Sequence, residues 1–408
     1  MKCRHCHAPL EASFVDLGTS PPSNSYLTFT DLDRPERYYP LRVAVCSKCW
    51  LVQTEDFTDR EEFFSDDYAY FSSFSTSWLD HSQRYVEAMQ RRFDLDDASL
   101  VIEVAANDGY LLQYVMAAGI GALGIEPTRS TAGAAREKGI DIVEEFFGMA
   151  LADRLAVEGR CADLTVANNV LAHVPNINDF VAGFARLLKP SGVATFEFPH
   201  LLKMLEFGQF DTIYHEHYSY LSLTAVERIF AGNGLVVFDV ETLPTHGGSL
   251  RVYAQRADSG IHPLTDAVGA MLTRETKCGV ANASFYAGFQ TRVDRLKDAF
   301  VDFLIAAKRD GRRVGAYGAA AKGNTLLNFA GIRRDLLPWV VDRNPAKVGK
   351  FMPGSRIPIV TEDRIREEQP DLIVILPWNI KDEVIAQLDY ARAWGAQFVT
   401  VIPELRIL

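Results

Sequence analysis

The sequence predicts an α/β protein in which a small N-terminal cysteine-rich domain precedes two units of alternating strands and helices. Two observations support this prediction. Two Cys-x-x-Cys pairs lie near the N-terminus, and short apolar segments alternate with helical segments from about residue 100 onwards. The length of 408 residues agrees, because one domain usually takes about 150 residues. We therefore expect domains over residues 1–75, 76–265 and 266–408.

The composition indicates a globular protein. Hydrophobic residues make up 48% of the chain and charged residues 23%. The net charge of −11 argues against a nucleic-acid partner, because neutralising phosphates requires a basic surface. No apolar run approaches the ~20 residues of a membrane helix, and residues 1–6 are not followed by the apolar stretch of a signal peptide. We expect a cytoplasmic monomer with no membrane partner.

The cysteines indicate a metal site. In a reducing compartment cysteines serve as metal ligands or buried thiols more often than as disulfides. Each Cys-x-x-Cys pair places two thiolates on one turn, and two such turns complete a tetrahedral Zn²⁺ site. A redox pair and chance spacing are the alternatives. Four thiolates leave zinc no open position, so we expect a structural ion. The predicted ligands are Cys3, Cys6, Cys46 and Cys49, and the solitary Cys161 and Cys278 are expected to be buried thiols.

The segment from residue 78 to 255 predicts a mainly parallel sheet covered by helices on both faces. A short joint at residues 243–248 favours an antiparallel hairpin at the sheet edge. The expected strands are 100–104, 122–125, 140–143, 164–167, 193–198, 235–242 and 249–255, and the expected helices include 78–92, 110–118 and 130–138.

A second α/β unit follows an amphipathic helix. Apolar residues recur every three or four positions over residues 289–307, which is typical of one buried helix face. The strands expected after it are 313–317, 339–341, 371–376 and 397–402, with a helix starting at Asn324.

The segment Tyr214-His215-Glu216-His217-Tyr218 concentrates groups that can move protons. Histidine is the side chain whose unperturbed pKa lies closest to neutrality, and a neighbouring carboxylate can tune it. We expect His217 to act as a general base, oriented or tuned by Glu216. The alternative is a polar surface turn whose histidines occur by chance.

The first strand-turn-helix of the central unit predicts a cofactor site. It reads Glu103-Val104-Ala105-Ala106-Asn107-Asp108-Gly109 and lacks the G-x-G-x-x-G of dinucleotide sites. An acidic strand end followed by small residues instead suits a ligand with a cationic amino-acid part, such as S-adenosylmethionine. Packing of a small turn is the alternative. The expected cofactor contacts are Glu103, Ala105, Asn107 and Gly109 in this turn, Glu126 at the ribose followed by Pro127, Phe146 at the adenine, and Asn168 and Asn169 beneath the methionine.

These motifs resemble class I (Rossmann-like) methyltransferases, although Ala105 and Ala106 replace glycines common there. Nearly the whole chain is similar to sugar C-methyltransferases that act on nucleotide-linked 4-keto deoxysugars. The motifs that carry this resemblance are Cys3-x-x-Cys6, Asp67-Tyr68-Ala69-Tyr70-Phe71-Ser72-Ser73, Asn107-Asp108-Gly109, Asn169-Val170-Leu171-Ala172-His173-Val174-Pro175, Tyr214-His215-Glu216-His217, His246-Gly247-Gly248 and Gly318-Ala319-Ala320-Ala321-Lys322.

The resemblance implies a zinc-binding N-terminal domain, a class I methyltransferase core and a second Rossmann-like α/β domain. It implies S-adenosylmethionine as methyl donor and a dTDP-linked or similar nucleotide sugar as substrate. The functional histidine of the family falls on His217, accompanied by Tyr214 and Glu216, while Tyr68 and His173 match its other active-site tyrosine and histidine. For His173 a capping or packing role is the alternative.

The turn over residues 318–324 offers small residues, backbone N–H groups at a helix start and one lysine. Such a turn can hold a pyrophosphate, and we expect Lys322, Asn324 and His246 to contact the substrate. A purely structural α/β unit is the alternative, and the spacing excludes a Walker loop. Competing functions are O- or N-methylation of a related molecule, a nicotinamide-dependent reaction, and binding without catalysis.

Overall fold

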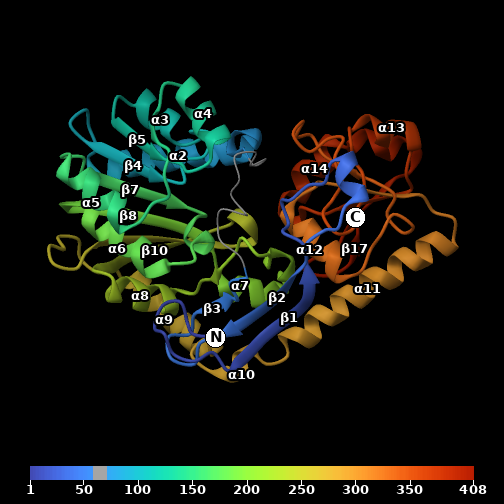
Figure 1. Ribbon diagram of the computed structural model, residues 1–408, viewed down its shortest axis with the longest axis horizontal. Helices are drawn as coiled ribbons and strands as arrows, with labels where there is room; N and C mark the ends of the chain where they lie inside the picture. Colours follow the sequence, from blue (N-terminus) through green and yellow to red (C-terminus); the bar gives the residue numbers. More distant parts are fainter. Residues whose placement is uncertain (58–70) are drawn as a thin grey trace.

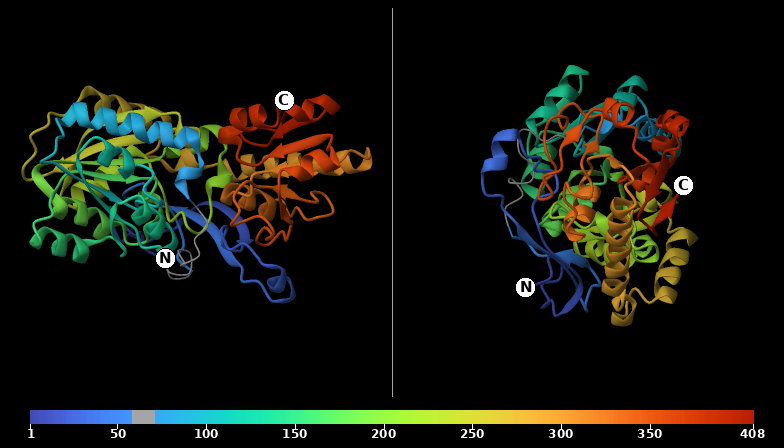
Figure 2. Two further views of the ribbon diagram at one scale, coloured as in Figure 1. Left: turned by 90° about the horizontal axis from the view of Figure 1, so that it is seen from above. Right: turned by 90° about the vertical axis from the view of Figure 1, so that its right-hand side faces the viewer.

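The computed structural model describes residues 1–57 and 71–408, so the predicted active-site residue Tyr68 lies outside the described residues. Three sheets organise the described chain. A central sheet and a C-terminal sheet form two lobes side by side, and the N-terminal strands run beneath both of them (Figures 1 and 2). The three sheets therefore all lie close to the region between the lobes.

The N-terminal sheet connects the two lobes. Its strands are all antiparallel, in the order β1 (Ala12–Ser20), β2 (Tyr39–Val45), β3 (Val52–Thr54) and β9 (Ser219–Tyr220). The last strand comes from the central part of the chain. At the other edge, Phe14 stacks on Phe289 of the C-terminal region with ring centroids 4.5 Å apart. Apolar burial thus fixes this small sheet against both of its neighbours.

The central sheet has the order β10-β11-β8-β7-β4-β5-β6. Its five strands from β8 to β6 are parallel, while β11 runs antiparallel to both β8 and β10, which confirms the predicted edge hairpin. The strands are β4 (Leu100–Val104), β5 (Gly121–Ile125), β6 (Asp141–Val143), β7 (Ala162–Asn168), β8 (Leu188–Pro199), β10 (Leu235–Leu243) and β11 (Ser249–Arg256). The chain leaves β4 towards β5 and β6 on one side and returns to β7 and β8 on the other. This reversal creates a crevice at the carboxyl ends of β4 and β7.

Helices pack on both faces of the central sheet because apolar stripes recur along each of them. α6, for example, buries Phe180, Phe184 and Leu187. The helices of this lobe are α2 (Thr76–Phe93), α3 (Leu112–Ala117), α4 (Arg129–Glu137), α5 (Met149–Val157), α6 (Ile177–Leu187), α7 (Leu201–Phe207) and α8 (Leu223–Gly232).

The C-terminal sheet is also mainly parallel and also reverses its strand order. Its order is β14-β13-β12-β15-β16-β17, parallel except for β17, so that β12 lies at a second reversal point. The strands are β12 (Val314–Tyr317), β13 (Val340–Val341), β14 (Ile359–Val360), β15 (Leu372–Ile375), β16 (Gln397–Thr400) and β17 (Arg406–Ile407). The accompanying helices are α11 (Phe289–Arg309), α12 (Ala321–Phe329), α13 (Asp363–Glu368) and α14 (Lys381–Gln387). Before them, α9 (Asp266–Cys278) packs against β10 and α8 of the central lobe, and Tyr286 of α10 (Ala283–Tyr286) contacts Phe14 of the N-terminal sheet.

The predicted amphipathic helix is α11, which buries Val293, Phe300 and Leu304 on one face. The helix expected to start at Asn324 begins three residues earlier, because the small residues of the turn already adopt helical geometry at Ala321. The prediction of a buried thiol is wrong for Cys278, which is exposed at the end of α9, and Cys161 is only partly buried. In the described chain no helix is both long and apolar enough to cross a membrane.

The four N-terminal cysteines converge at the base of the first sheet. Their sulfur atoms all lie within 4.8 Å of one another, with 3.5 Å between Cys3 and Cys49 and 3.4 Å between Cys6 and Cys46. Sulfur ligands of a tetrahedral zinc site lie ~3.8 Å apart, given Zn–S distances of about 2.3 Å. The arrangement therefore suits zinc. The side-chain amide of Gln53 donates to the Cys3 sulfur, and the backbone N–H of Lys48 donates to the Cys46 sulfur.

We expect protein purified without chelator to contain one zinc ion per chain. Cys46→Ser should abolish stoichiometric zinc and unfold the N-terminal sheet, whereas Cys278→Ser, at an exposed cysteine outside the cluster, should leave both unchanged. Elemental analysis combined with hydrogen exchange of β1–β3 makes the comparison. A zinc-free wild type, or equal zinc in both variants, would contradict the assignment.

Candidate active site

A single cavity of about 380 Å³ joins the central and C-terminal sheets. On one side it is lined by residues that follow β4, β5 and β7, namely Ala105, Glu126 and Asn169. On the other side it is lined by residues that follow β12 and β15, including Ala320 and Pro377. The crevices at the reversal points of both parallel sheets therefore open into the same space, which is where open α/β sheets bind ligands.

The turn after β4 has a strained backbone at the cavity. Ala105 has φ of 60° and Asn107 has φ of 48°, both in the left-handed region that costs an alanine about 1–2 kcal/mol. Gly109 has φ of 74°, and a Cβ there would overlap Ile140. Ala105 and Asn107 line the cavity, whereas Gly109 is not among its lining residues and serves the close packing of the turn.

Glu126 presents a rigid carboxylate at the end of β5. Its Oε2 accepts a hydrogen bond of 2.9 Å from the backbone N–H of Asn107, and its Oε1 accepts one of 2.9 Å from that of Thr128. Burial raises the pKa of Glu126, although these hydrogen bonds oppose the shift. Glu126 lines the cavity together with Pro127 and Phe146. Oε1 also accepts from the Thr128 hydroxyl, so Oε2 keeps the lone pair that can accept a ribose hydroxyl.

Two buried polar side chains near this turn lack partners. Neither carboxylate oxygen of Glu103 has a hydrogen bond of ordinary geometry in the described structure, and neither do the amide atoms of Asn168. Burial raises the pKa of Glu103 well above its usual range, with the nearby Tyr110 hydroxyl opposing the shift. Asn168 lines the cavity, whereas Glu103 in β4 is fully buried and is not among the lining residues. Unsatisfied buried groups indicate a ligand, and Asn168 is positioned to meet one bound in the cavity.

The segment from Phe210 to Tyr218 lies at the meeting point of the three sheets. It is buried rather than a surface turn: His215 and Glu216 are 5% and 2% exposed. Each part of the molecule holds it by hydrogen bonds. From the C-terminal domain, Trp378 donates to Asp211 and Thr325 donates to the Ile213 carbonyl. From the N-terminal part, Asn24 donates to Glu216 and Thr54 donates to the Tyr218 carbonyl. Tyr218 in turn donates to the Ala172 carbonyl of the central domain.

His217 forms a pair with Tyr214. Its Nδ1 lies 2.7 Å from the carbonyl of Thr212, and its Nε2 lies 2.7 Å from the Tyr214 hydroxyl. Because a carbonyl can only accept, Nδ1 carries the proton and Nε2 accepts from the phenol. Burial lowers the pKa of His217 well below its ordinary value, and the charge of His173 adds to the shift. His217 is therefore neutral near pH 7, with its lone pair at Nε2.

His173 lies edge-on to His217, with ring centroids 4.5 Å apart. Burial lowers the pKa of His173 to about 4, so this imidazole is also neutral. Both histidines line the cavity together with Tyr214 and Glu216. The predicted proton-transfer residues of the described chain are thus brought together at one wall.

Glu216 has a partner that the sequence did not suggest. The hydrogen bonds of the His217 ring go to Tyr214 and Thr212, while the Glu216 Oε2 accepts 2.8 Å from the Asn24 amide. Burial raises the pKa of Glu216 to about 7, and Asn24 opposes the shift. Asn24 lines the cavity as well. The zinc-bearing part of the chain therefore contributes a side chain to the site.

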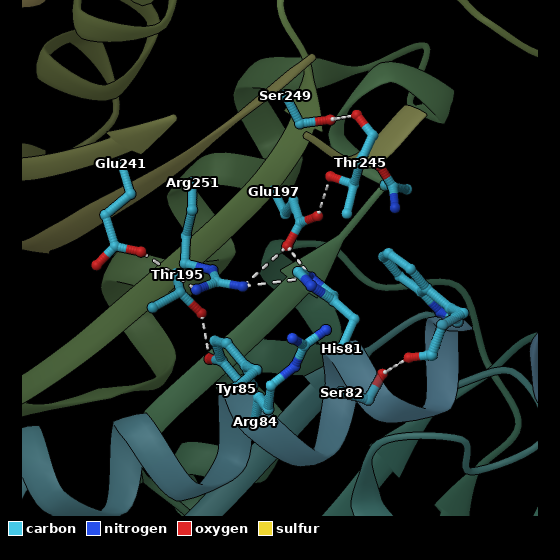
Figure 3. A network of polar contacts seen from close by, with 12 residues as sticks. His81, Ser82, Arg84, Tyr85, Thr195, Glu197, Glu241, Thr245, Ser249 and Arg251 are labelled. Carbon is cyan, nitrogen blue, oxygen red and sulfur yellow. Dashed lines mark hydrogen bonds and ion pairs between the residues drawn. The ribbon is translucent and has the colours of Figure 1, made fainter. Parts of the chain in front are cut away.

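His246 is held by a buried polar network. It occupies a left-handed position (φ 53°), and its Nε2 accepts 3.1 Å from the Asn169 amide. The preceding Thr245 donates to Glu197, whose other oxygen lies 2.9 Å from His81 and 3.2 Å from Arg251 (Figure 3). Burial raises the pKa of Glu197, but His81 and Arg251 lower it more. This compensated charge fixes the loop that places His246 in the cavity.

The C-terminal side of the cavity carries Lys322 and Lys347, of which only Lys322 was predicted. Asn324 is fully buried and is not among the lining residues. Trp378 and Asn379 follow β15 and surround Lys322. The rule that ligands meet the carboxyl ends of parallel strands could have pointed to this segment, because the sequence prediction did place a strand before it.

Comparison with known proteins agrees with this architecture. Family models match a zinc-binding domain at residues 3–64, a methyltransferase domain at 78–240 and a C-methyltransferase C-terminal domain at 244–403. C-methyltransferase NovU of Streptomyces niveus is 32% identical over 407 residues, which cover 100% of this chain and 96% of NovU.

Solved structures overlap with about half of the chain. The PH0226 protein of Pyrococcus horikoshii OT3 gives a TM-score of 0.38 at 14% identity, covering 49% of this chain and 99% of its own. Magnesium protoporphyrin IX methyltransferase of Synechocystis PCC 6803 gives 0.36 at 15% identity, covering 50% and 100%. Likeness at this level carries no functional argument.

The fold, the cofactor edge and the matched domains define a class I methyltransferase that uses S-adenosylmethionine and carries a structural zinc ion. The full-length match to NovU places it further: the chain belongs to the C-methyltransferase family.

Glu126→Ala should weaken S-adenosylmethionine binding by about 1–3 kcal/mol, because the ribose hydroxyls would lose their acceptor in a buried site. Glu158→Ala, an exposed glutamate at the end of α5, should leave affinity unchanged. Isothermal calorimetry measures both. Equal affinities of the two variants would move the ribose site away from β5.

Proposed function

We propose that the enzyme methylates a nucleotide-activated 4-keto deoxysugar at the carbon next to the ketone. The observation that carries this proposal is the shared cavity. It joins the S-adenosylmethionine edge of the central sheet, the His217–Tyr214 pair and the reversal point of the C-terminal sheet. A sugar linked to a nucleotide can then place its reactive carbon at the first sheet and its nucleotide at the second. Localisation in the cytoplasm and a monomeric state stay predictions.

Carbon methylation requires a carbanion equivalent. A ketone at C4 acidifies the proton on C3, and a base removes it to give an enolate. The lone pair of His217 Nε2 supports this role. In the described structure the Tyr214 hydroxyl donates a hydrogen bond to Nε2. The C3 proton therefore passes to Nε2 directly after Tyr214 moves aside, or it passes to the phenol oxygen while the phenol proton passes to Nε2. Both routes leave the proton on Nε2, while Nδ1–H stays fixed on the Thr212 carbonyl. Bound S-adenosylmethionine supplies the electrophilic methyl group.

The neighbouring groups support orientation of the sugar. Glu216 has a pKa of about 7, so near neutrality it can either donate to or accept from a sugar hydroxyl. Asn24 fixes its direction. Neutral His173 and His246 offer further contacts along the same cavity. Tyr68 remains a predicted contact outside the described residues.

The nucleotide is proposed to bind at the C-terminal sheet. The α12 helix starts at Ala321 beside the cavity, and its first backbone N–H groups lack intrahelical partners, which favours an anion. Lys347 lines the same region, where its Nζ donates to the Ala319 carbonyl over 2.9 Å. Because Asn324 is buried away from the cavity lining, we assign it to the packing of α12 rather than to direct contact.

His217→Asn keeps the approximate size of the side chain but removes a base of useful pKa. In D₂O the wild type should exchange the C3 proton of a 4-keto sugar, even without methyl donor. The variant should lose both exchange and methylation by ~10²–10⁴-fold and bind S-adenosylmethionine normally. NMR follows the exchange. His7→Asn, an exposed residue outside the cavity lining, is the matched control.

Unchanged activity of His217→Asn would move the base to Tyr214 or His173. Methylation without exchange, with the methyl group on oxygen in the product, would instead establish the heteroatom reaction.

A further inference from the structure

Lys322 brings a positive charge into the cavity and forms no ion pair with the described residues. It lines the cavity and is half-buried, and no carboxylate of the described residues lies within the 4.0 Å of an ion pair. Its Nζ donates to a neutral acceptor, the Asn379 side-chain oxygen, over 3.2 Å. Holding an unpaired ammonium group away from bulk water is costly. The position therefore favours a ligand that carries or develops negative charge.

The surrounding contacts hold Lys322 beside the base. The Nζ lies 4.8 Å from the centroid of the Trp378 ring, whose indole N–H donates 2.7 Å to Asp211. The next residue, Thr212, supplies the carbonyl that fixes His217 Nδ1. Lys322 and His217 are thus linked through one short segment, η4 (Phe210–Thr212).

The electrostatic effects agree with this geometry. After burial and the neighbouring His173, the charge of Lys322 helps to lower the pKa of His217, and after burial it helps to lower that of His246. Burial also lowers the pKa of Lys322 itself, while the Asp211 charge opposes the shift. The ammonium group therefore lies near both imidazoles that face the proposed sugar site.

The second cavity lysine has a different environment. Lys347 lies 3.9 Å from Asp342 and donates to the Ala319 carbonyl, and its ammonium group lies 5.2 Å from the centroid of the Tyr26 ring. Asp342 partly compensates the charge of Lys347, and the hydrogen bond to Ala319 fixes its ammonium group at the turn after β12. Of these two lysines, Lys322 is the one that has no carboxylate of the described residues within ion-pair distance and whose contacts lead to His217.

We propose that Lys322 is the oxyanion donor of the reaction: its ammonium group hydrogen-bonds the ketone oxygen at C4 and stabilises the enolate. This inference rests on the proposed C-methylation of a 4-keto sugar. As the C3–H bond breaks, its electron pair forms the C3=C4 double bond, the carbonyl π pair moves to oxygen, and the proton goes to His217. When C3 attacks the methyl group, the oxygen pair re-forms the ketone. Lys322 stays protonated throughout and matches charge that develops only during reaction.

The alternative to this role is a diphosphate contact, and the two roles differ in what substitution changes. Lys322→Met removes the charge, and Lys322→Gln keeps a polar end. Each is compared with Lys308→Met at an exposed lysine that pairs with Asp335 on the surface. The substrate is a nucleoside-diphosphate 4-keto-6-deoxyhexose that the wild type methylates. Thymidine diphosphate alone probes the nucleotide subsite, and S-adenosylmethionine affinity reports folding.

Both Lys322 variants should lower the rate of C3 deuterium exchange, and kcat, by ~10²–10³-fold. KM and thymidine diphosphate affinity should stay within about threefold of wild type, and Lys308→Met should match wild type throughout. Normal exchange with a tenfold or greater loss of thymidine diphosphate affinity would overturn the oxyanion role and establish a diphosphate contact. Normal exchange in either variant overturns the inference alone. Failure of the wild type to methylate any 4-keto sugar overturns the proposed function and the inference together.

Discussion

The site depends on the hydrogen bonds that hold the segment from Phe210 to Tyr218 between three parts of the chain. The C-terminal domain fixes its beginning through Trp378 and Thr325, and the N-terminal sheet fixes its end through Asn24 and Thr54. A buried segment must find a partner for each backbone group, and a single 3-10 turn, η4, supplies few of them here. Here those partners belong to different domains, so the correct placement of His217 requires all three to be docked.

This constraint explains why a zinc-bearing domain accompanies a methyltransferase core. Four thiolates close the base of the N-terminal sheet, and the loop that follows β1 reaches the cavity with Asn24. Within that loop, the Tyr26 hydroxyl donates 2.6 Å to the Ala319 carbonyl of the C-terminal domain. The four cysteines are not among the residues that line the cavity, yet the part of the chain that zinc stabilises contributes Asn24 to the site. Because the crevices of the two sheets open into one cavity, a methyl donor at the first sheet and a methyl acceptor at the second would meet there.

Local sequence patterns were sufficient for features that depend on local geometry. The paired cysteines, the parallel strands and the edge hairpin follow from spacing and periodicity, and the structure has them. The ends of β5 and β7 were likewise predicted to face a ligand, and Glu126 and Asn169 line the cavity. Contacts between domains could not be derived this way. Asn24 lies in an ordinary polar loop, and only the docked structure shows that it meets Glu216.

The Glu197 network illustrates the same limit. His81, Glu197 and Arg251 come from a helix and two strands that are far apart in the sequence, and no motif connects them. The strained turn was also difficult to predict, because Ala105 adopts a positive φ that normally indicates glycine. Tertiary packing imposes that conformation where the backbone lines the cavity.

A crystal structure with S-adenosylhomocysteine and thymidine diphosphate tests most directly the claim that one cavity joins the two sheets. The account predicts both ligands in that cavity, with the adenosine ribose on Glu126 and the diphosphate at the start of α12. A diphosphate bound elsewhere would contradict it. An example of such a contradicting result is a diphosphate bound in the groove of the C-terminal domain that Arg312, Arg313 and Arg334 line.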